Sequence, residues 1–491
     1  MAATSILIKD ATVITVDEKL GTQLHCDILV EDGVIKAVGP GLSANSGRVD
    51  EVIDGTNCIV SPGFVDTHHH LWQQLLRGVT TDWSLGNYIE HIRNVYGSLY
   101  TPEDVYTANY FAGLDLLNNG ITTVIDHCHI LNSPKHVDAA IKGLKDAHVR
   151  GTWCFGFYEN PGRADLPDAN HTVATPAGFD HAARVAEARR AREEHFPDND
   201  PATQLLTFGG APAEAEGMTL AALQQEIDLF RSLGARVITM HVAMGNYDVN
   251  HQIVQQLGDA GYLGRDLLFS HGASFTESEF ALIRAAGAGV SSTPETDLQM
   301  GMGHPVAFKA AARGCHVGLG IDITSNQNND FLALMRLLLQ AERGKRHGEL
   351  LQAPHRTAAE RVPLAIAPQS HEALYMATLG GARSIHLDHL IGSITPGKRA
   401  DLVVTRCDDM NAVPVTNPIG ALMFNVHIGN IDTVLVNGKI VKQGGQVLNV
   451  DWPKLRAEVR ERSARMYAID QSAPPPPRGL WNSLISGSPK V

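Results

Sequence analysis

Three consecutive histidines follow a short apolar run near the start of the chain, in the segment Pro62–His70. If this run is a β-strand, residues two apart point to the same side, so His68 and His70 share a face that His69 does not. Two imidazoles that converge at the end of a strand suit a divalent metal ion such as zinc. Because surface histidines at a strand end would show the same spacing, a metal site requires further ligands elsewhere.

Three further residues with metal-binding or acid–base side chains stand at the ends of later apolar runs. These are His241, His271 and Asp322. In barrel enzymes the functional side chains come from the carboxyl ends of several different strands. The order and placement of these residues therefore predict one site shared by all of them.

The apolar runs alternate with helical stretches through the middle of the chain. The strand-like runs are Gly63–Asp66, Thr122–Asp126, Thr152–Phe157, Leu205–Gly209, Arg236–Met240, Leu267–Ser270, Gly289–Ser292 and His316–Gly320. Helical stretches between them include Leu220–Leu233, Glu277–Ala286 and Phe331–Glu342. Eight strands separated by helices predict an α/β fold, the (β/α)₈ TIM barrel. A doubly wound open sheet is the rival, but no GxGxxG turn follows the first strand.

Both ends of the chain are rich in short strands and turns. Asp32-Gly33 and Asn437-Gly438 are typical hairpin turns. We therefore expect residues 1–61 and 390–450 to form one small composite β-sandwich domain beside a barrel of residues 62–389.

The last segment, residues 451–491, has a different pattern. A helix is predicted over Lys454–Ala468, and the Pro-rich stretch Pro474–Pro477 follows it. We expect this helix to pack on the barrel or on a neighbouring subunit.

Composition narrows the class of protein. The 491 residues include 40 Lys and Arg against 53 Asp and Glu, a net charge of −13, which argues against nucleic acid as the main partner. No apolar run reaches the roughly 18–20 residues that span a bilayer, and Met1–Ser5 lacks the features of a signal peptide. The six cysteines are scattered without a CxxC pair, so we expect a reducing, cytoplasmic location.

Longer motifs carry a resemblance to a known family. They are Pro62–His70, Gln73 with Leu75–Gly78, Gly120–Thr123, Gly318–Asp322 with Asn326, and Gly392–Leu402. With these motifs, which extend over nearly the whole chain, the sequence resembles the amidohydrolase superfamily. It is most similar to the branch that holds S-adenosylhomocysteine, guanine and 8-oxoguanine deaminases and the triazine chlorohydrolases.

The resemblance implies roles for the strand-end residues. His68, His70, His241 and Asp322 would hold one metal ion per chain, zinc or, as in some relatives, iron. His271 would polarise the attacking water, and Asp322 would also accept its proton. Zinc lowers the pKa of bound water towards 7, which makes hydroxide available at neutral pH. A carboxylate beside it can take the proton and pass it to the leaving group.

One position departs from the family pattern. The deaminases usually carry a glutamate three residues after the strand-five histidine, and it protonates a ring nitrogen, but this chain has Met244 there. A thioether donates no proton, so either another acid replaces the glutamate or the substrate needs no such proton. Glu295 is the best candidate, with a solvated loop carboxylate as the alternative. No lysine ends the run Leu205–Gly209, so we do not expect a bridged two-metal site.

Five residues are candidates for substrate contact. Gln73 and Trp83 follow strand one, where relatives contact substrate. His127 and His129 form a second HxH pair after strand two. His304 lies in a glycine-rich loop and either lines the pocket or caps a turn.

These observations predict a metal-dependent hydrolase that displaces an amino or similar leaving group from a nitrogen heterocycle. Hydrolysis of an amide or cyclic amide at the same site is the alternative, since it needs no ring-protonating acid. A non-catalytic scaffold is a remote third reading, against which the complete ligand set argues. We expect a small heterocyclic substrate, no nucleic-acid or membrane partner, and a homodimer or higher homo-oligomer.

Overall fold

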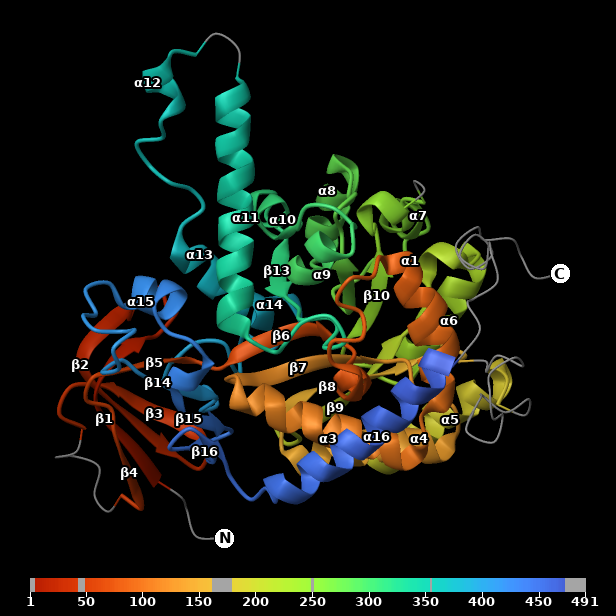
Figure 1. Cartoon of the computed structure of the whole chain (residues 1–491), viewed down its shortest axis with the longest axis horizontal. Coiled ribbons are helices and arrows are strands. Elements are labelled where there is room, and N and C mark those ends of the chain that lie inside the picture. The colour runs from red at the N-terminus through yellow and green to blue at the C-terminus, as the bar shows by residue number, and fades with distance from the viewer. Residues whose placement is uncertain (1–4, 43–48, 161–178, 249–250, 354–355, 473–491) are drawn as a thin grey trace.

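The computed structural model describes residues 5–42, 49–160, 179–248, 251–353 and 356–472. Its centre is a closed barrel of parallel strands, which confirms the predicted (β/α)₈ fold (Figure 1). The barrel strands are β6 (Phe64–His69), β7 (Ile121–Cys128), β8 (Arg150–Gly156), β9 (Leu206–Ala211), β10 (Ile238–Val242), β11 (Leu267–His271), β12 (Gly289–Ser292) and β13 (His316–Leu319). Each predicted apolar run corresponds to one of these strands.

Helices surround the barrel on its outer side (Figure 1). They include α3 (Pro102–Asn118), α4 (Pro134–Ala147), α5 (His181–His195), α6 (Leu220–Ser232), α7 (Ile253–Asp259), α8 (Glu277–Ala286), α9 (Pro294–Gln299), α10 (Ala307–Ala312), α11 (Phe331–Gln352) and α13 (Ser370–Tyr375). Further helical elements of the chain are η2 (Leu71–Leu76), α1 (Leu85–Tyr88), η3 (Ile89–Tyr96), α2 (Gly97–Leu99), η5 (Ala215–Gly217), η6 (Gly245–Tyr247), α12 (Ala358–Arg361), η7 (Met376–Gly380), α14 (Gly381–Ser384), α15 (Pro418–Phe424) and η8 (Ile428–Asn430).

Helix α11 is longer than the apolar pattern predicts. It continues past Glu342 to Gln352, and its outer part projects away from the barrel together with α12 (Figure 1). The extension is polar apart from Leu350 and Leu351, so it carries no apolar stripe to detect, and no proline interrupts the sequence from Arg343 to Gln352.

The second domain is built from both ends of the chain, as predicted. Its strands form one nine-stranded sheet. They are β1 (Ser5–Ile14), β2 (Thr22–Glu31), β3 (Val34–Gly39), β4 (Glu51–Asp54), β5 (Cys58–Pro62), β14 (Leu402–Arg406), β15 (Ile431–Val436), β16 (Lys439–Gln443) and β17 (Gln446–Val447). The two ends meet where β5 pairs antiparallel with β14. The bounds 1–61 and 390–450 remain a prediction.

The C-terminal helix α16 (Trp452–Ser472) lies along the helices of the barrel (Figure 1). Arg462 Nη1 is 2.9 Å from Asp104 Oδ1, and Arg465 pairs with the second oxygen of the same carboxylate. The Tyr96 hydroxyl also donates to Asp470 Oδ2 at 3.0 Å. These contacts hold α16 on the barrel. The predicted Pro-rich stretch Pro474–Pro477 lies outside the described residues.

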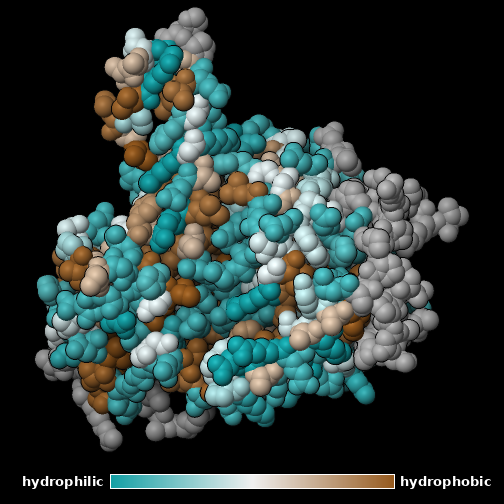
Figure 2. All heavy atoms as spheres, viewed as in Figure 1, coloured by the Kyte–Doolittle hydropathy of each residue, from teal (hydrophilic) through white to brown (hydrophobic). Residues whose placement is uncertain are grey.

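The described helices and the exposed apolar side chains bear on membranes and on possible partners. Among the described helices, none combines the length and the apolar composition that a membrane crossing requires. Apolar side chains are exposed on the projecting arm formed by the end of α11 and the segment after α12, and Figure 2 shows them gathered there.

Candidate metal centre and substrate pocket

The end of β6 directs two imidazoles into the mouth of the barrel. His68 and His70 are both buried. Their Nδ1 atoms are already engaged: His68 Nδ1 lies 2.9 Å from Ser270 Oγ, and His70 Nδ1 donates to the His127 carbonyl at 2.7 Å. Each ring is therefore held in orientation with its Nε2 directed at the centre of the site.

Asp322 joins this pair from the segment after β13. Its Oδ1 lies 3.4 Å from His68 Nε2 and 3.3 Å from His70 Nε2. A side chain at Gly320 would place a Cβ 2.8 Å from the Cβ and the carbonyl oxygen of His68, so glycine permits this close approach. The φ angle of 74° at Asp322 is strained for a non-glycine residue, a feature that concentrates at functional sites.

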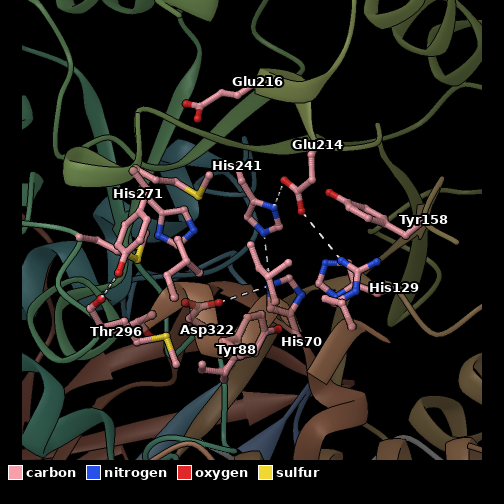
Figure 3. Close-up of a pocket in the computed structure, with 18 of the residues that line it drawn as sticks. His70, Tyr88, His129, Tyr158, Glu214, Glu216, His241, His271, Thr296 and Asp322 are labelled. Atoms are coloured by element: carbon pink, nitrogen blue, oxygen red, sulfur yellow. Dashed lines mark hydrogen bonds and ion pairs between the residues drawn. The ribbon is translucent and has the colours of Figure 1, made fainter. Parts of the chain in front are cut away.

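His241 and His271 complete the cluster from β10 and β11 (Figure 3). His241 Nε2 lies 3.3 Å from His70 Nε2, while its Nδ1 faces Glu214 Oε2 at 3.1 Å. His271 Nδ1 contacts Thr293 Oγ1 at 2.8 Å. The second nitrogen of each ring is thus fixed by the protein, the pattern typical of metal-ligating histidines.

The donor set fits a divalent cation. Ligand atoms of His68, His70 and Asp322 lie within 4.8 Å of one another, and so do those of His68, His241 and His271. His68 Nε2 is buried without a hydrogen-bond partner. A buried polar atom of this kind is costly unless a ligand satisfies it. Imidazole nitrogens and one carboxylate are the ligands of zinc and related metals.

Burial and local hydrogen bonds put these groups in the protonation states that bind cations. Burial lowers the pKa of His68 well below its ordinary value and lowers the pKa of His70 to about 4. Burial alone would raise the pKa of Asp322, but the neighbouring imidazoles of His68 and His70 hold it well below its ordinary value. Neutral imidazoles beside an ionised carboxylate are the forms that a metal requires.

A pocket of about 260 Å³ opens above this cluster (Figure 3). It is lined by His70, Leu85, Tyr88, Ile89, Arg93, His129, Tyr158, Glu159, Glu214, Glu216, Gly217, His241, Met244, Tyr247, His271, Thr296, Met300, Met302, Asp322 and Ile323. Aliphatic, thioether and aromatic side chains alternate with a few polar groups, which is the usual composition of a site for a small organic molecule.

Comparison with known proteins identifies the family. Residues 59–441 match the model of the amidohydrolase family. The chain belongs to the amidohydrolase family. The resemblance inferred from the motifs is confirmed, and so is the predicted class, a hydrolase.

Relatives are similar to this amidohydrolase over almost their full lengths. A 5-methylthioadenosine/S-adenosylhomocysteine deaminase of Pelotomaculum thermopropionicum is 29% identical over 482 residues, which cover 94% of this chain and 99% of that protein. A 5'-deoxyadenosine deaminase of Methanosarcina mazei is 25% identical over 470 residues, 94% of this chain and 98% of that protein. An adenosine deaminase structure from Xanthomonas campestris with bound zinc has a TM-score of 0.79 at 22% identity, and the match covers 95% of this chain and 99% of that one.

The structure places the predicted substrate residues unequally. Among the described residues, His129 lines the pocket, and its ring stacks on His70 with centroids 4.0 Å apart. Gln73 lies behind the lining, where it donates to the Tyr88 hydroxyl at 2.5 Å. His127 also lies behind it, stacked on His241 with centroids 4.4 Å apart.

Three further candidates lie away from the described lining. Trp83 packs against His91. His304 Nε2 pairs with Glu342 Oε2 at 2.8 Å. Glu295 lies on α9, and burial, with Asp330 nearby, raises its pKa to about 7. The lining near α9 is made by Thr296 and Met300 instead. The structure therefore does not bring Glu295 into the pocket of this amidohydrolase.

Three carboxyl groups of the described lining, those of Glu159, Glu214 and Glu216, were not predicted from the sequence. Glu214 and Glu216 come from the loop after β9 and line the pocket. Their signal was available, because polar residues after a barrel strand are candidates for function. The lysine of a bridged two-metal site would end strand four itself, whereas these two acids follow the strand by three and five residues, beyond Ala211.

Proposed function

We propose that this amidohydrolase removes the exocyclic amino group of an aminopurine nucleoside by hydrolysis. The observation that carries the proposal is the convergence of His68, His70, His241 and Asp322 at the floor of one small pocket. Relatives that match along nearly their whole length are named as deaminases of adenine nucleosides, which supports this substrate class.

We propose zinc as the metal, one ion per chain, held by His68, His70, His241 and Asp322. When bound, zinc supplies Lewis acidity that makes a water molecule nucleophilic at neutral pH. His271 lies beside this point, and its Nδ1 contact with Asp297 at 3.3 Å orients its Nε2 toward the water. Asp322 takes the proton of the water and gives it to the departing amine. Of the predicted substrate residues, His129 is the one we retain for substrate contact.

The test is a panel of adenosine, 5'-deoxyadenosine, 5'-methylthioadenosine and S-adenosylhomocysteine, assayed for ammonia release. Enzyme with one equivalent of zinc should release ammonia from at least one nucleoside, and exhaustive chelation should abolish the release. Absence of ammonia from every member with the metal content verified would contradict the proposal.

Hydrolysis of a cyclic amide is the second candidate, and Met244 favours it. Opening of a cyclic amide needs only the proton that the attacking water releases, which Asp322 can pass to the leaving ring nitrogen, so a thioether at this position is no handicap. The same panel should therefore include cyclic amides assayed by acid release. Acid release without ammonia release would decide for this candidate.

We further propose that the protein is cytoplasmic and forms a homo-oligomer. Its cysteines are free in the described structure, which suits a reducing compartment. On the projecting arm Leu351 is 66% exposed and Leu364 fully so, and a second copy of the chain would cover them. Sedimentation analysis should show a dimer or larger species, and Leu364→Asp should shift it towards monomer. A wild-type monomer would contradict the proposal.

A further inference from the structure

Relatives carry a ring-protonating glutamate at the position that Met244 occupies in this chain, so the sequence offers no acid there. A carboxyl group from the segment after a neighbouring strand lies beside this position. We propose that Glu216 donates the proton to the ring nitrogen of the heterocycle, in place of the glutamate that relatives carry at the position of Met244. This inference rests on the proposed deamination and assigns its missing acid.

Geometry brings Glu216 to this position. The residue lies in η5, after β9, and its Oε1 accepts the backbone N–H of Ala243 at 2.6 Å. Ala243 directly precedes Met244, and both Glu216 and Met244 line the pocket. The carboxyl group of Glu216, which follows β9, therefore contacts the segment after β10 that would carry the family's glutamate. Its side chain is only 9% exposed, so bulk water does not compete for the proton.

The surroundings keep this carboxyl group protonated at neutral pH. Burial raises the pKa of Glu216 to about 8, and the charges of Asp248 and Glu214 add to the increase, while the Ala243 N–H and His271 oppose it. His251, whose Nδ1 is 3.8 Å from Glu216 Oε2, is the other titratable group facing it. A neutral carboxylic acid is the form that can donate a proton.

Glu214, two residues earlier, has the opposite character. Burial would raise its pKa, but His241 and Arg93 lower it to about 2. Its Oε2 faces His241 Nδ1 at 3.1 Å, so it stays ionised and orients that ring. One loop thus presents two carboxyl groups with divergent pKa values, an arrangement that separates an acid from a charged supporting group.

The remaining carboxyl groups of the described lining are engaged or unsuitable. Asp322 is committed to His68 and His70, and Glu159 is exposed to solvent. Glu295, the candidate from the sequence, is outside the lining. Glu216, in contrast, is buried and lines the pocket. Arg93, the arginine of the lining, pairs with Glu214 and not with Glu216.

The proton balance of the step is complete. Water adds to the ring carbon that carries the amino group, and a new C–O bond forms while the C=N electron pair moves onto the ring nitrogen. That nitrogen takes the proton of Glu216. Asp322 receives the proton of the water and delivers it to the amino group, the C–N bond breaks, and ammonia leaves. The C=O bond then forms as the hydroxyl proton is released and returns to Glu216, directly or through solvent, and the ring nitrogen keeps the proton that it received.

The experiment compares Glu216→Gln with the matched control Glu295→Gln on the nucleoside that the wild type deaminates. Glu216→Gln should lower kcat by on the order of 10²–10⁴-fold, the usual worth of a positioned general acid, with metal content and KM near wild type. Glu295→Gln should be unchanged. The double variant Glu216→Gln/Met244→Glu, which restores the family pattern, should recover part of kcat.

Two further readouts separate proton donation from a structural role. Because the protonated form is the active one, wild-type kcat should be full below pH 8 and fall as the pH rises through about 8, a limb that Glu216→Gln should lack. Infrared difference spectra should show a protonated carboxyl band that disappears in Glu216→Gln. Wild-type kinetics in Glu216→Gln would overturn the inference while the deamination stands. A wild type that deaminates nothing would overturn both.

Discussion

Two pairs of histidines with the same spacing end neighbouring strands of the barrel, and they differ in what holds them. In the first pair, His68 and His70, the Nδ1 atoms face a hydroxyl and a carbonyl, which leaves both Nε2 atoms beside Asp322. In the second pair, His127 Nε2 faces the Tyr158 hydroxyl at 3.0 Å, and His129 Nδ1 accepts from Trp72 Nε1 at 3.4 Å.

The difference shows that spacing alone does not make a ligand. The HxH pattern puts two rings on one face of a strand in either case. Only in the first pair are both Nδ1 atoms held by the protein while both Nε2 atoms lie beside a carboxylate, that of Asp322. The second pair stacks on the first and on His241, so it shapes the wall of the pocket.

The largest effect should come from removing one ring of each pair. His70→Ala should lose the metal and lower activity on the order of 10³-fold or more, since a bound metal supplies several kcal/mol. His129→Ala should keep the metal and mainly raise KM. Elemental analysis of both variants checks this. Metal loss in His129→Ala would make the second pair part of the metal site, through the neighbouring set of His70, His129 and His241.

A smaller effect should follow from changing a ring that reaches the water and not the metal. His271→Asn should lower kcat by on the order of 10²–10⁴-fold, with metal content near wild type, because in the arrangement that we propose His271, held by Thr293 and Asp297, is not one of the four ligands. Kinetics and elemental analysis on the same preparation test the prediction. If the metal leaves with the ring, His271 is a ligand.

Next in size is the loss of a group behind a ligand. Glu214→Gln removes the charge that fixes His241 Nδ1, and metal affinity should fall by about 10–100-fold. Ser270→Ala, which removes only a neutral hydroxyl behind His68, should cost less. Competition titration with a chelator measures both affinities. Equal losses in the two variants would show that charge behind the ligand is unimportant here.

Much of the fold could be predicted from the sequence because the barrel strands are buried on both faces. Such strands appear as apolar runs, and a glycine or polar residue marks where each ends. Thr276 and Glu279 also predict the start of α8, where the structure has the complete capping box. The extension of α11 could not be found in this way, because its exposed surface imposes no apolar period.

The residues of the candidate site also differ in whether the sequence could identify them. Residues at the carboxyl end of a strand, such as His241 and His271, could be found from where the apolar run ends. Glu216 could not be assigned, because its role depends on a contact with Ala243 across two strands. His127 and Gln73 show the converse: sequence placed them near the site, but only packing shows that they support Tyr158 and Tyr88 instead of lining the cavity.

The smallest effect should come from loosening the second pair without removing a ring. Tyr158→Phe leaves the aromatic wall in place but removes the hydroxyl that meets His127 Nε2. A buried nitrogen without its partner costs about 1–3 kcal/mol, so the melting temperature should fall by a few degrees while metal content stays at wild type. Tyr106→Phe, which removes an exposed hydroxyl bonded to Asp146, is the matched control and should change stability less. Because Tyr158 lines the pocket, KM serves as a second measure. If Tyr158→Phe lowered metal affinity as Glu214→Gln does, the two pairs would form one coupled unit, and the distinction between ligands and wall would fail.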